Sequence, residues 1–186
     1  METLTQQFYY LRHHRTLAHD QELICGGQTD LPLSESSVEY MLHYGEHIAA
    51  CLQNVRAIYT TNLVRARQTA EAVNVHLNLP IKEIANLKEW CLGDWEGQKW
   101  NDLPHPFTFE GKPPNGEARS DFRNRIRQSV TELLHTGEVF LIVAHGIVFH
   151  ELSDYFTDQP EYIETAELVE LCHANKQWTL KRIPYL

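Results

Sequence analysis

Arginine, histidine and glutamate residues follow short apolar segments at four places in the chain. They are Arg12-His13, Arg65, Glu89 and His145. Arginine presents planar, paired donors that suit phosphate oxygens. An unprotonated histidine nitrogen can attack phosphorus, and a carboxylic acid can protonate the leaving alcohol and then deprotonate an attacking water. Together, these residue types fit the transfer of a phosphoryl group.

The apolar pattern predicts the elements that would position these side chains. Short apolar runs predict strands at residues 7–11, 56–60, 81–87 and 139–144, and two final strands at 165–172 and 177–183 around a turn at 173–175. Helical spacing predicts helices over residues 38–52, 63–77, 117–133 and 147–155. Ser34 would cap the first helix, and Thr60, Thr61 or Asn62 the second. This alternation predicts an α/β fold: a three-layer sandwich with a mostly parallel central sheet and helices on both faces.

The predicted topology would bring the ionisable residues to one rim. In open α/β sheets, ligands bind beyond the carboxyl ends of the strands, where Arg12, His13, Arg65, Glu89 and His145 would all lie. The chain has a formal net charge of −9, so a phosphate-bearing substrate needs such a local concentration of positive charge. The same arginines would lower the pKa of His13 and keep its imidazole unprotonated.

Six short motifs that include these residues follow one another between residues 8 and 150. They are Leu11-Arg12-His13, GQTDLPLS (27–34), TTNLVRARQTAE (60–71), LKEWCLGDWEG (87–97), PNGE (114–117) and VAHG (143–146). In this order they resemble the histidine phosphatase superfamily, the phosphoglycerate-mutase-like or RHG proteins. The match is specific because it combines six motifs, any one of which would be weak.

The resemblance implies a role for each residue. His13 would take the phosphoryl group, Arg12, Arg65 and His145 would hold its oxygens, and Glu89 would be the general acid and base. The substrate-binding residues that it implies are Arg12, His19, Gln28, Thr29, Arg65, His145 and Gly146. It implies no metal and no cofactor. The reaction would be hydrolysis of a phosphomonoester through a phosphohistidine intermediate.

The chain departs from the family pattern at three positions near the predicted nucleophile. His14 stands where the family usually has glycine, Arg15 where it has glutamate, and His19 where it often has asparagine. If position 14 requires a positive φ, a Cβ atom there costs energy. All three changes would add basic groups near the pocket and could alter the choice of substrate.

Length and composition predict the general class of the protein. The 186 residues suit a single domain over 1–186, in which residues 90–116 form a loop region that covers the pocket. Within that loop, Trp100, Phe107 and Phe109 would favour an aromatic or apolar leaving group. The negative charge makes nucleic acid and anionic membrane poor partners, so the expected partner is a small phosphorylated metabolite. Four cysteines without paired spacing indicate reduced thiols and a cytoplasmic location. A homodimer is one option for the assembly.

The same residues also fit other interpretations. Each candidate residue alone is more often structural, and only their convergence favours a site. A mutase that moves phosphate within a sugar acid would use the same residues, although such mutases are usually longer. A weakly active or inactive module that binds a phospho-ligand or a protein is favoured only by His14 and His19. The HYGEH segment at 43–47 fits a zinc-peptidase pattern, but it lies opposite the apolar stripe and is expected to be a solvated helix face.

Overall fold

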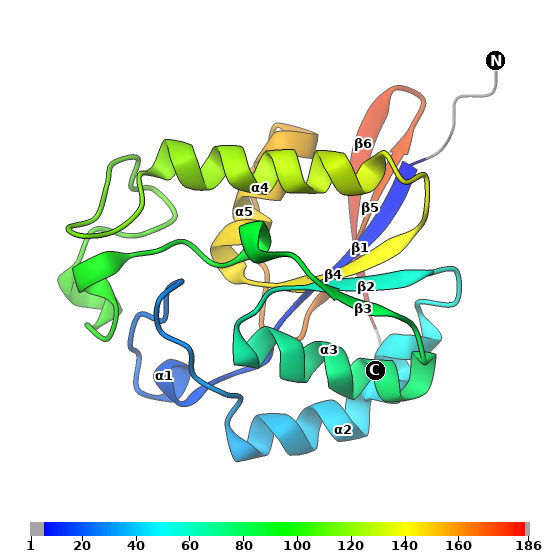
Figure 1. Ribbon diagram of the computed structural model, residues 1–186, viewed down its shortest axis with the longest axis horizontal. Coiled ribbons are helices and arrows are strands. Elements are labelled where there is room, and N and C mark those ends of the chain that lie inside the picture. The colour runs from blue at the N-terminus through cyan, green and yellow to red at the C-terminus, as the bar shows by residue number, and fades with distance from the viewer. Residues whose placement is uncertain (1–5, 185–186) are drawn as a thin grey trace.

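The structure is a computed structural model that describes residues 6–184, with one six-stranded sheet between two layers of helices (Figure 1). The strands are β1 (Gln6–Arg12), β2 (Ala57–Thr60), β3 (Ile81–Glu83), β4 (Phe140–Ala144), β5 (Leu168–Ala174) and β6 (Gln177–Ile183). The helices are α1 (Leu17–Asp20), α2 (Glu35–Ala50), α3 (Val64–Leu77), α4 (Arg119–Leu134) and α5 (Gly146–Thr157). Three short 3-10 helices are η1 (Ala85–Leu87), η2 (Gly93–Trp95) and η3 (Trp100–Asp102). Within residues 6–184, no helix combines the length and the hydropathy needed to cross a membrane.

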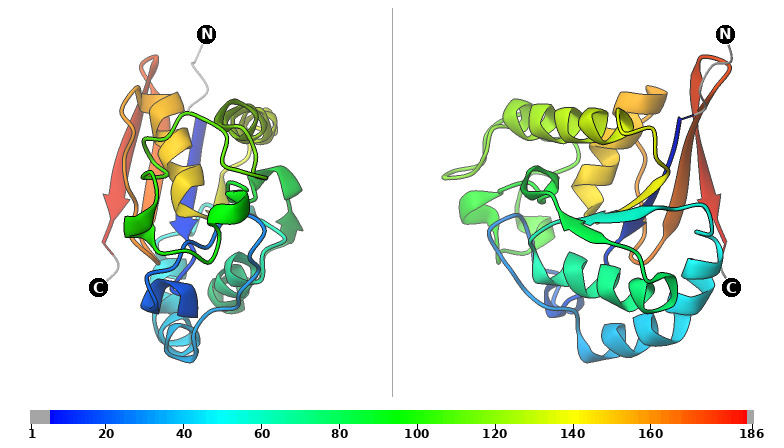
Figure 2. Two further views of the ribbon diagram at one scale, coloured as in Figure 1. Left: turned by 90° about the vertical axis from the view of Figure 1, so that its left-hand side faces the viewer. Right: turned by 45° about the vertical axis from the view of Figure 1, so that its right-hand side comes forward.

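The strand order is β3-β2-β4-β1-β5-β6. The first four strands in this order pair in parallel, whereas β5 pairs antiparallel with both β1 and β6. Figures 1 and 2 show the β5–β6 hairpin at one edge of the sheet and the long loops gathered at the carboxyl ends of the parallel strands. The predicted α/β fold, with a mostly parallel sheet covered on both faces, is therefore confirmed.

The register between β1 and β4 determines where the site forms. Arg12 pairs with Ala144, so His13 and His145 are the next residues on two adjacent parallel strands. The amide of His13 donates a hydrogen bond of 2.9 Å to the carbonyl oxygen of Ala144, which extends the ladder by one residue. Two histidines that lie 132 positions apart in the sequence are thereby neighbours.

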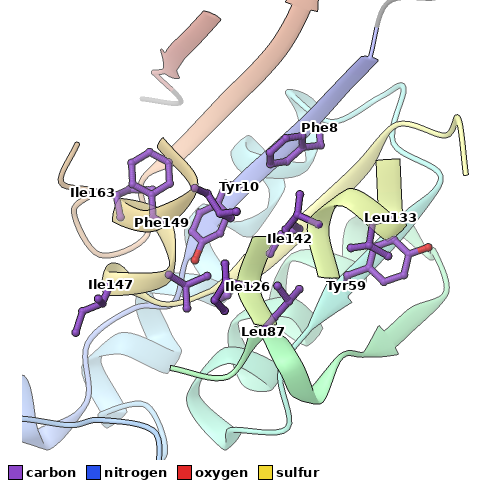
Figure 3. Close-up of a cluster of buried hydrophobic side chains, with 14 of the residues drawn as sticks. Phe8, Tyr10, Tyr59, Leu87, Ile126, Leu133, Ile142, Ile147, Phe149 and Ile163 are labelled. Atoms are coloured by element: carbon purple, nitrogen blue, oxygen red, sulfur yellow. The ribbon is translucent and has the colours of Figure 1, made fainter. Parts of the chain in front are cut away.

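Both faces of the central strands are buried in apolar layers. Phe8 and Tyr10 of β1 belong to the layer under α4 and α5, whereas Tyr9 and Leu11 belong to the layer under α2 and α3. Figure 3 shows the first layer, where side chains of β1, β2 and β4 meet those of α4 and α5. Alternate residues of one strand therefore serve opposite layers, which explains the continuous apolar runs of β1 and β4.

Several element boundaries differ from the sequence predictions. Helix α3 has Leu63 as its N-cap residue, because the Thr61 hydroxyl accepts the Leu63 amide (3.3 Å) and delays the first helical turn. Strand β3 ends at Glu83, and the chain then forms η1. The hairpin turn falls at Asn175 and Lys176, not at 173–175. Both have positive φ (53° and 67°), as two-residue turns that match the twist of a hairpin require.

A buried ion pair joins α4, α5 and the loop that precedes α4. Arg119 and Glu151 are 1% and 2% exposed, and the Arg119 Nη2 donates to the Glu151 carboxylate. The Nη1 of Arg119 donates to the Pro106 carbonyl (2.9 Å), and its guanidinium lies 4.8 Å from the centre of the Trp90 ring. This ion pair therefore holds the loop around residue 106 against the two helices.

Removing the charge of Glu151 should destabilise the fold. Glu151→Gln leaves the Arg119 guanidinium buried without a counter-charge, and we expect the free energy of unfolding to fall by about 3 kcal/mol. Urea denaturation followed by circular dichroism measures this change. Glu132→Gln, on the exposed face of α4, the helix that carries Arg119, is the matched control and should change stability little. Equal stabilities of the two variants would contradict the assigned role of the ion pair.

Candidate active site

A cavity of about 350 Å³ opens at the carboxyl ends of β1 and β4. Five of the predicted site residues line it: Arg12, His13, His19, Glu89 and Gly146. Arg65 and His145 are fully buried directly behind His13, so the structure brings together all five predicted catalytic residues. The remaining lining residues are Leu23, Cys25, Leu92, Trp100, His105, Phe107, Ile147, Tyr162, Ile163 and Glu164.

The hydrogen bonds of His13 define which ring nitrogen carries the proton. Its Nδ1 lies 2.6 Å from the carbonyl oxygen of His14. A carbonyl can only accept, so Nδ1 is protonated and Nε2 keeps its lone pair. The Nε of Arg65 donates to this Nε2 at 3.2 Å. Burial, followed by the nearby Arg65, holds the pKa of His13 well below its usual value, so the ring stays neutral at physiological pH.

Arg65 lies in the first turn of α3, and main-chain carbonyls hold its guanidinium in place. Its Nη1 donates to the Thr29 carbonyl (2.8 Å) and its Nη2 to the Gly26 carbonyl (3.0 Å). The loop that supplies these carbonyls packs against the chain at Glu89, where a Cβ on Gly27 would lie 2.3 Å from the Glu89 carbonyl oxygen. Glycine at position 27 therefore permits the approach that joins the Arg65 loop to the Glu89 segment.

Arg12 and His19 lie together at one side of the cavity. The Arg12 Nη1 donates to the Ile163 carbonyl (2.8 Å), whereas its buried Nε has no partner among the described residues. The Nδ1 of His19 accepts the Thr16 amide (3.2 Å), and its Nε2 lies 3.3 Å from Arg12 Nη2. Burial, followed by Arg12, lowers the pKa of His19 to about 3. The Arg12 guanidinium, with its unpartnered Nε, favours an anion at this position.

Gly146 allows the Arg12 side chain to pass close to the start of α5. A Cβ at this position would lie 3.3 Å from the Arg12 Cζ, which is closer than most side-chain contacts. The next residue, Ile147, directs its amide to the carboxylate of Glu89 at 3.2 Å. The first turn of α5 therefore contributes to the site through its main chain.

His145 is oriented from both ends. The Tyr10 hydroxyl donates to the His145 carbonyl (2.7 Å) and accepts the His145 amide (2.9 Å). The hydroxyl of Thr61 lies 3.0 Å from His145 Nε2, while the buried Nδ1 has no partner within the described chain. The Thr61 hydroxyl also accepts the amide of Leu63, and its proton is free to point to Nε2. With the proton in that position, His145 Nδ1 is the protonated ring nitrogen and can donate to an oxygen bound beside His13.

Glu89 is a buried carboxyl group held by two amides. Its Oε1 accepts the amide of Trp90 (2.9 Å) and its Oε2 that of Ile147 (3.2 Å). Burial nevertheless raises the pKa of Glu89 above its ordinary value. Arg125 fixes the main chain here by donating to the carbonyls of Lys88 (2.7 Å) and Glu89 (3.1 Å). A positioned carboxyl with a raised pKa suits general acid catalysis.

Gln28 and Thr29 do not line the cavity. The Gln28 side chain is exposed and donates to Cys91 Sγ (2.8 Å). The amides of both residues donate to Glu96, at 3.0 Å and 2.6 Å. Glu96 thus holds the loop in a conformation in which the Thr29 carbonyl orients Arg65. In this structure the two residues act on Arg65 through the loop, and that they bind substrate directly stays a prediction.

Of the three departures from the family pattern, only His19 faces the cavity. His14 points to α2, where its Nδ1 lies 2.7 Å from Ser37 Oγ and its ring stacks on Tyr40 at 4.4 Å. Its φ lies outside the positive region, so the Cβ introduces no strain. Arg15 pairs with Asp20 (2.8 Å) on the exposed surface. All three groups lie near the pocket, but only that of His19 faces the cavity.

The covering loop contributes only part of its predicted surface. Trp100 and Phe107 line the cavity, whereas Phe109 packs on Trp95 (4.9 Å between ring centres) and does not reach it. The segment 162–164, which follows α5, lines the cavity without having been predicted. Its residues carry no motif, and only the path of the chain after α5 could have revealed them.

The zinc-peptidase pattern does not form a site. His43, Glu46 and His47 are all exposed on α2, as expected for a solvated helix face. Across residues 6–184, no three histidine, cysteine, aspartate or glutamate side chains are grouped as they would be to bind a metal ion.

Comparison with known proteins identifies the family. Residues 8–184 match the family model of the histidine phosphatase superfamily (branch 1). The chain therefore belongs to the histidine phosphatase superfamily, as the six motifs predict.

Curated relatives include a phosphatase and probable mutases. The uncharacterized phosphatase PhoE of Bacillus subtilis strain 168 is 28% identical over 164 residues, which cover 84% of this chain and 83% of PhoE. The probable phosphoglycerate mutase GpmB of Serratia proteamaculans strain 568 is 26% identical over 188 residues, covering 91% and 83%. The names of the relatives therefore indicate phosphatase or mutase activity.

Solved structures share the fold. A mycobacterial glucosyl-3-phosphoglycerate phosphatase superposes with a TM-score of 0.80 at 24% identity, covering 94% of this chain and 97% of its own. A phosphoglycerate mutase from Bacillus anthracis strain Sterne also superposes with a TM-score of 0.80, at 18% identity, covering 98% and 94%. At this level of identity the likeness concerns the fold.

The buried histidines should make stability depend on pH. The pKa values of His13, His19 and His145 are all lowered in the folded protein, so the unfolded chain binds more protons below about pH 6.5. The free energy of unfolding should therefore fall as pH decreases from 7.5 to 5.5, by up to about 1.4 kcal/mol per pH unit for each histidine. Glu89, whose pKa is raised, opposes this in part. Urea denaturation at several pH values measures the slope.

His14 and His150 also have lowered pKa values and contribute in the same direction. His19→Asn removes one of these groups, and the slope of stability against pH should become shallower. Stability that is constant over this pH range, or that increases on acidification, would contradict the neutral state of these rings.

Proposed function

We propose that this chain hydrolyses the phosphomonoester of a small molecule, with His13 as the nucleophile and Glu89 as the general acid and base. One observation carries the proposal. The unprotonated Nε2 of His13 lies among Arg12, His19, Arg65 and His145, which present several donors and include two buried atoms without a partner in the described chain. A phosphoryl group placed there would find a nucleophile and hydrogen bonds for its oxygens at once.

In the first step, the Nε2 of His13 attacks phosphorus and the P–O bond to the alcohol breaks. The protonated carboxyl of Glu89 gives its proton to the departing oxygen, so that a neutral alcohol leaves. Arg12, Arg65 and His145 stabilise the charge on the three transferring oxygens. The hydrogen bond from Nδ1 to the His14 carbonyl supports the positive charge that the imidazole gains when it carries the phosphoryl group.

In the second step, water attacks the phosphohistidine. The ionised Glu89 takes a proton from this water, the P–N bond breaks, and its electron pair returns to His13 Nε2. The products are inorganic phosphate and an enzyme in its starting protonation state. Because Glu89 accepts two main-chain amides, its carboxylate stays in place for both proton transfers.

Two alternatives remain distinguishable by experiment. A mutase would return the phosphoryl group from His13 to a second hydroxyl group of a sugar acid, and the relatives named as probable mutases motivate this option. A module that only binds phospho-ligands would need neither a neutral His13 nor a buried Glu89. The geometry therefore favours a reaction over simple binding.

The remaining properties follow from the same proposal. All four cysteines are free thiols, which agrees with a reducing compartment. A cytoplasmic location, a small metabolite as partner, independence of metal and the option of a homodimer stay predictions.

The phosphohistidine should be observable directly. Rapid quenching in alkali of enzyme mixed with 4-nitrophenyl phosphate should give a protein heavier by one phosphoryl group, with the group on His13 after peptide mapping. His13→Ala should show no such species and should lose at least about 1,000-fold in kcat/KM. His14→Ala, which changes the neighbouring ring that faces α2, is the control and should still form the adduct. Turnover that persists in His13→Ala would refute the mechanism.

The role of Glu89 predicts a dependence on the leaving group. Glu89→Gln keeps the shape of the side chain but cannot transfer a proton, so kcat/KM for phenyl phosphate should fall by about 100- to 10,000-fold. The loss should be much smaller for 2,4-dinitrophenyl phosphate, whose leaving group needs no proton. An equal loss for both esters would show that Glu89 acts by another route. Glu132→Gln, which changes an exposed carboxylate of α4 that does not line the cavity, is the matched control.

A further inference from the structure

The cavity has two chemically different halves. One half contains the nucleophile and the phosphate donors around Arg12 and His13. The other half is formed by the covering loop and by the segment after α5. Its aromatic side chains are those of Trp100, His105, Phe107 and Tyr162. The second half would receive the alcohol that leaves during the reaction. Its chemistry therefore determines which phosphomonoesters fit.

Aromatic rings form the outer wall of this second half. The Phe107 ring lies 4.7 Å from the ring of Tyr162 and 5.4 Å from that of His105, measured between centres. Trp100 faces the same cavity and is partly exposed. Buried Leu92 and Ile163 complete an apolar surface behind these rings. A flat aromatic group can make extensive contacts here, because stacked and edge-to-face arrangements are both available.

The second half carries negative charge and no cation of its own. Arg12 is the only lysine or arginine among the described residues that line the cavity, and it lies at the phosphate end. Its Nη1 is already bound to the carbonyl of Ile163. The next residue, Glu164, lines the cavity and acts electrostatically on Arg12. A substrate with a second negative group, such as a carboxylate, would meet Glu164 without a cation to pair with it.

We propose that the second half selects a phosphomonoester whose alcohol carries an aromatic ring and no negative charge. This inference rests on the proposed phosphatase activity. Trp100 and Phe107 provide the contacts for the ring, and Glu164 disfavours anionic alcohols. The contact between Arg12 and the Ile163 carbonyl fixes Glu164 relative to the phosphate end. Sugar acids that bear a carboxylate, the substrates of a mutase, are poor candidates on this ground.

A series of matched esters tests the proposal. Benzyl phosphate, 4-carboxybenzyl phosphate and 4-(aminomethyl)benzyl phosphate share a ring and a benzylic leaving oxygen but differ in the charge of the ring substituent, and ethyl phosphate lacks the ring. We expect kcat/KM for benzyl phosphate to exceed that for ethyl phosphate by about tenfold or more. The carboxybenzyl ester should be slower than the benzyl ester by at least about fivefold, and the aminomethyl ester should be no slower.

Two variants and one matched control separate the contribution of Glu164 from that of Trp100. Glu164→Gln should reduce the discrimination between benzyl and carboxybenzyl esters by about two- to fivefold. Asp102→Asn removes an exposed carboxylate of η3 that does not line the cavity, and it should leave the ratio as in the wild type. Trp100→Ala should reduce the ratio of benzyl to ethyl phosphate. Each ratio is measured within one variant, so a general loss of activity does not affect the comparison.

The outcomes distinguish this inference from the proposed function. Hydrolysis of all four esters with the carboxybenzyl ester as good as the benzyl ester would overturn the selectivity but leave the phosphatase activity intact. If no ester is hydrolysed, the proposed function fails. Binding of the matching benzylphosphonates, measured by calorimetry, then decides the selectivity, because it requires no turnover. Tighter binding of the neutral than of the carboxylated phosphonate would support it, and the reverse order would overturn it.

Discussion

A buried, positively charged pocket in an acidic chain is the constraint on which the structure depends. Arg65 is completely buried, and its three hydrogen bonds go to His13 and to two main-chain carbonyls, none of them a carboxylate. Carbonyl oxygens satisfy the donors of a guanidinium but do not neutralise its charge. The Arg65 charge therefore favours an anion such as a phosphoryl group in the pocket. Burial, followed by this charge, keeps His13 neutral.

Much of the surrounding structure holds this arrangement in place. Glu96 accepts the amides of the 27–29 loop, so that the loop can present its carbonyls to Arg65. Arg125 donates to the carbonyls of Lys88 and Glu89. The hydroxyl of Tyr10 binds the carbonyl and the amide of His145. Each of these contacts acts on the main chain. The Glu89 segment and His145 are thus positioned through their backbone, which leaves His145 Nδ1 without a partner among the described residues.

The fold and the centre of the site could be predicted from the sequence because both depend on local patterns. Continuous apolar runs indicate strands that are buried on both faces, and parallel strands place their carboxyl ends at one edge of a sheet. Arg12, His13 and His145 follow such runs directly, so their proximity could be predicted from the sequence. Periodicity gave less support for assigning Glu89 and Arg65 to the site. Their assignment depended on the six ordered motifs.

Other features were decided only by tertiary contacts. From sequence alone, His14 and His19 are equivalent basic residues beside the nucleophile, yet one stacks on Tyr40 of α2 and the other lines the cavity next to Arg12. The approach of Glu164 to the substrate end of the pocket is likewise invisible in the sequence, because it depends on the path of the chain after α5. The sequence by itself determined which residues could transfer a phosphoryl group, since residue type and strand periodicity are local properties. Only the tertiary structure decided which side chains line the outer half of the cavity, because those contacts join segments that no local pattern relates.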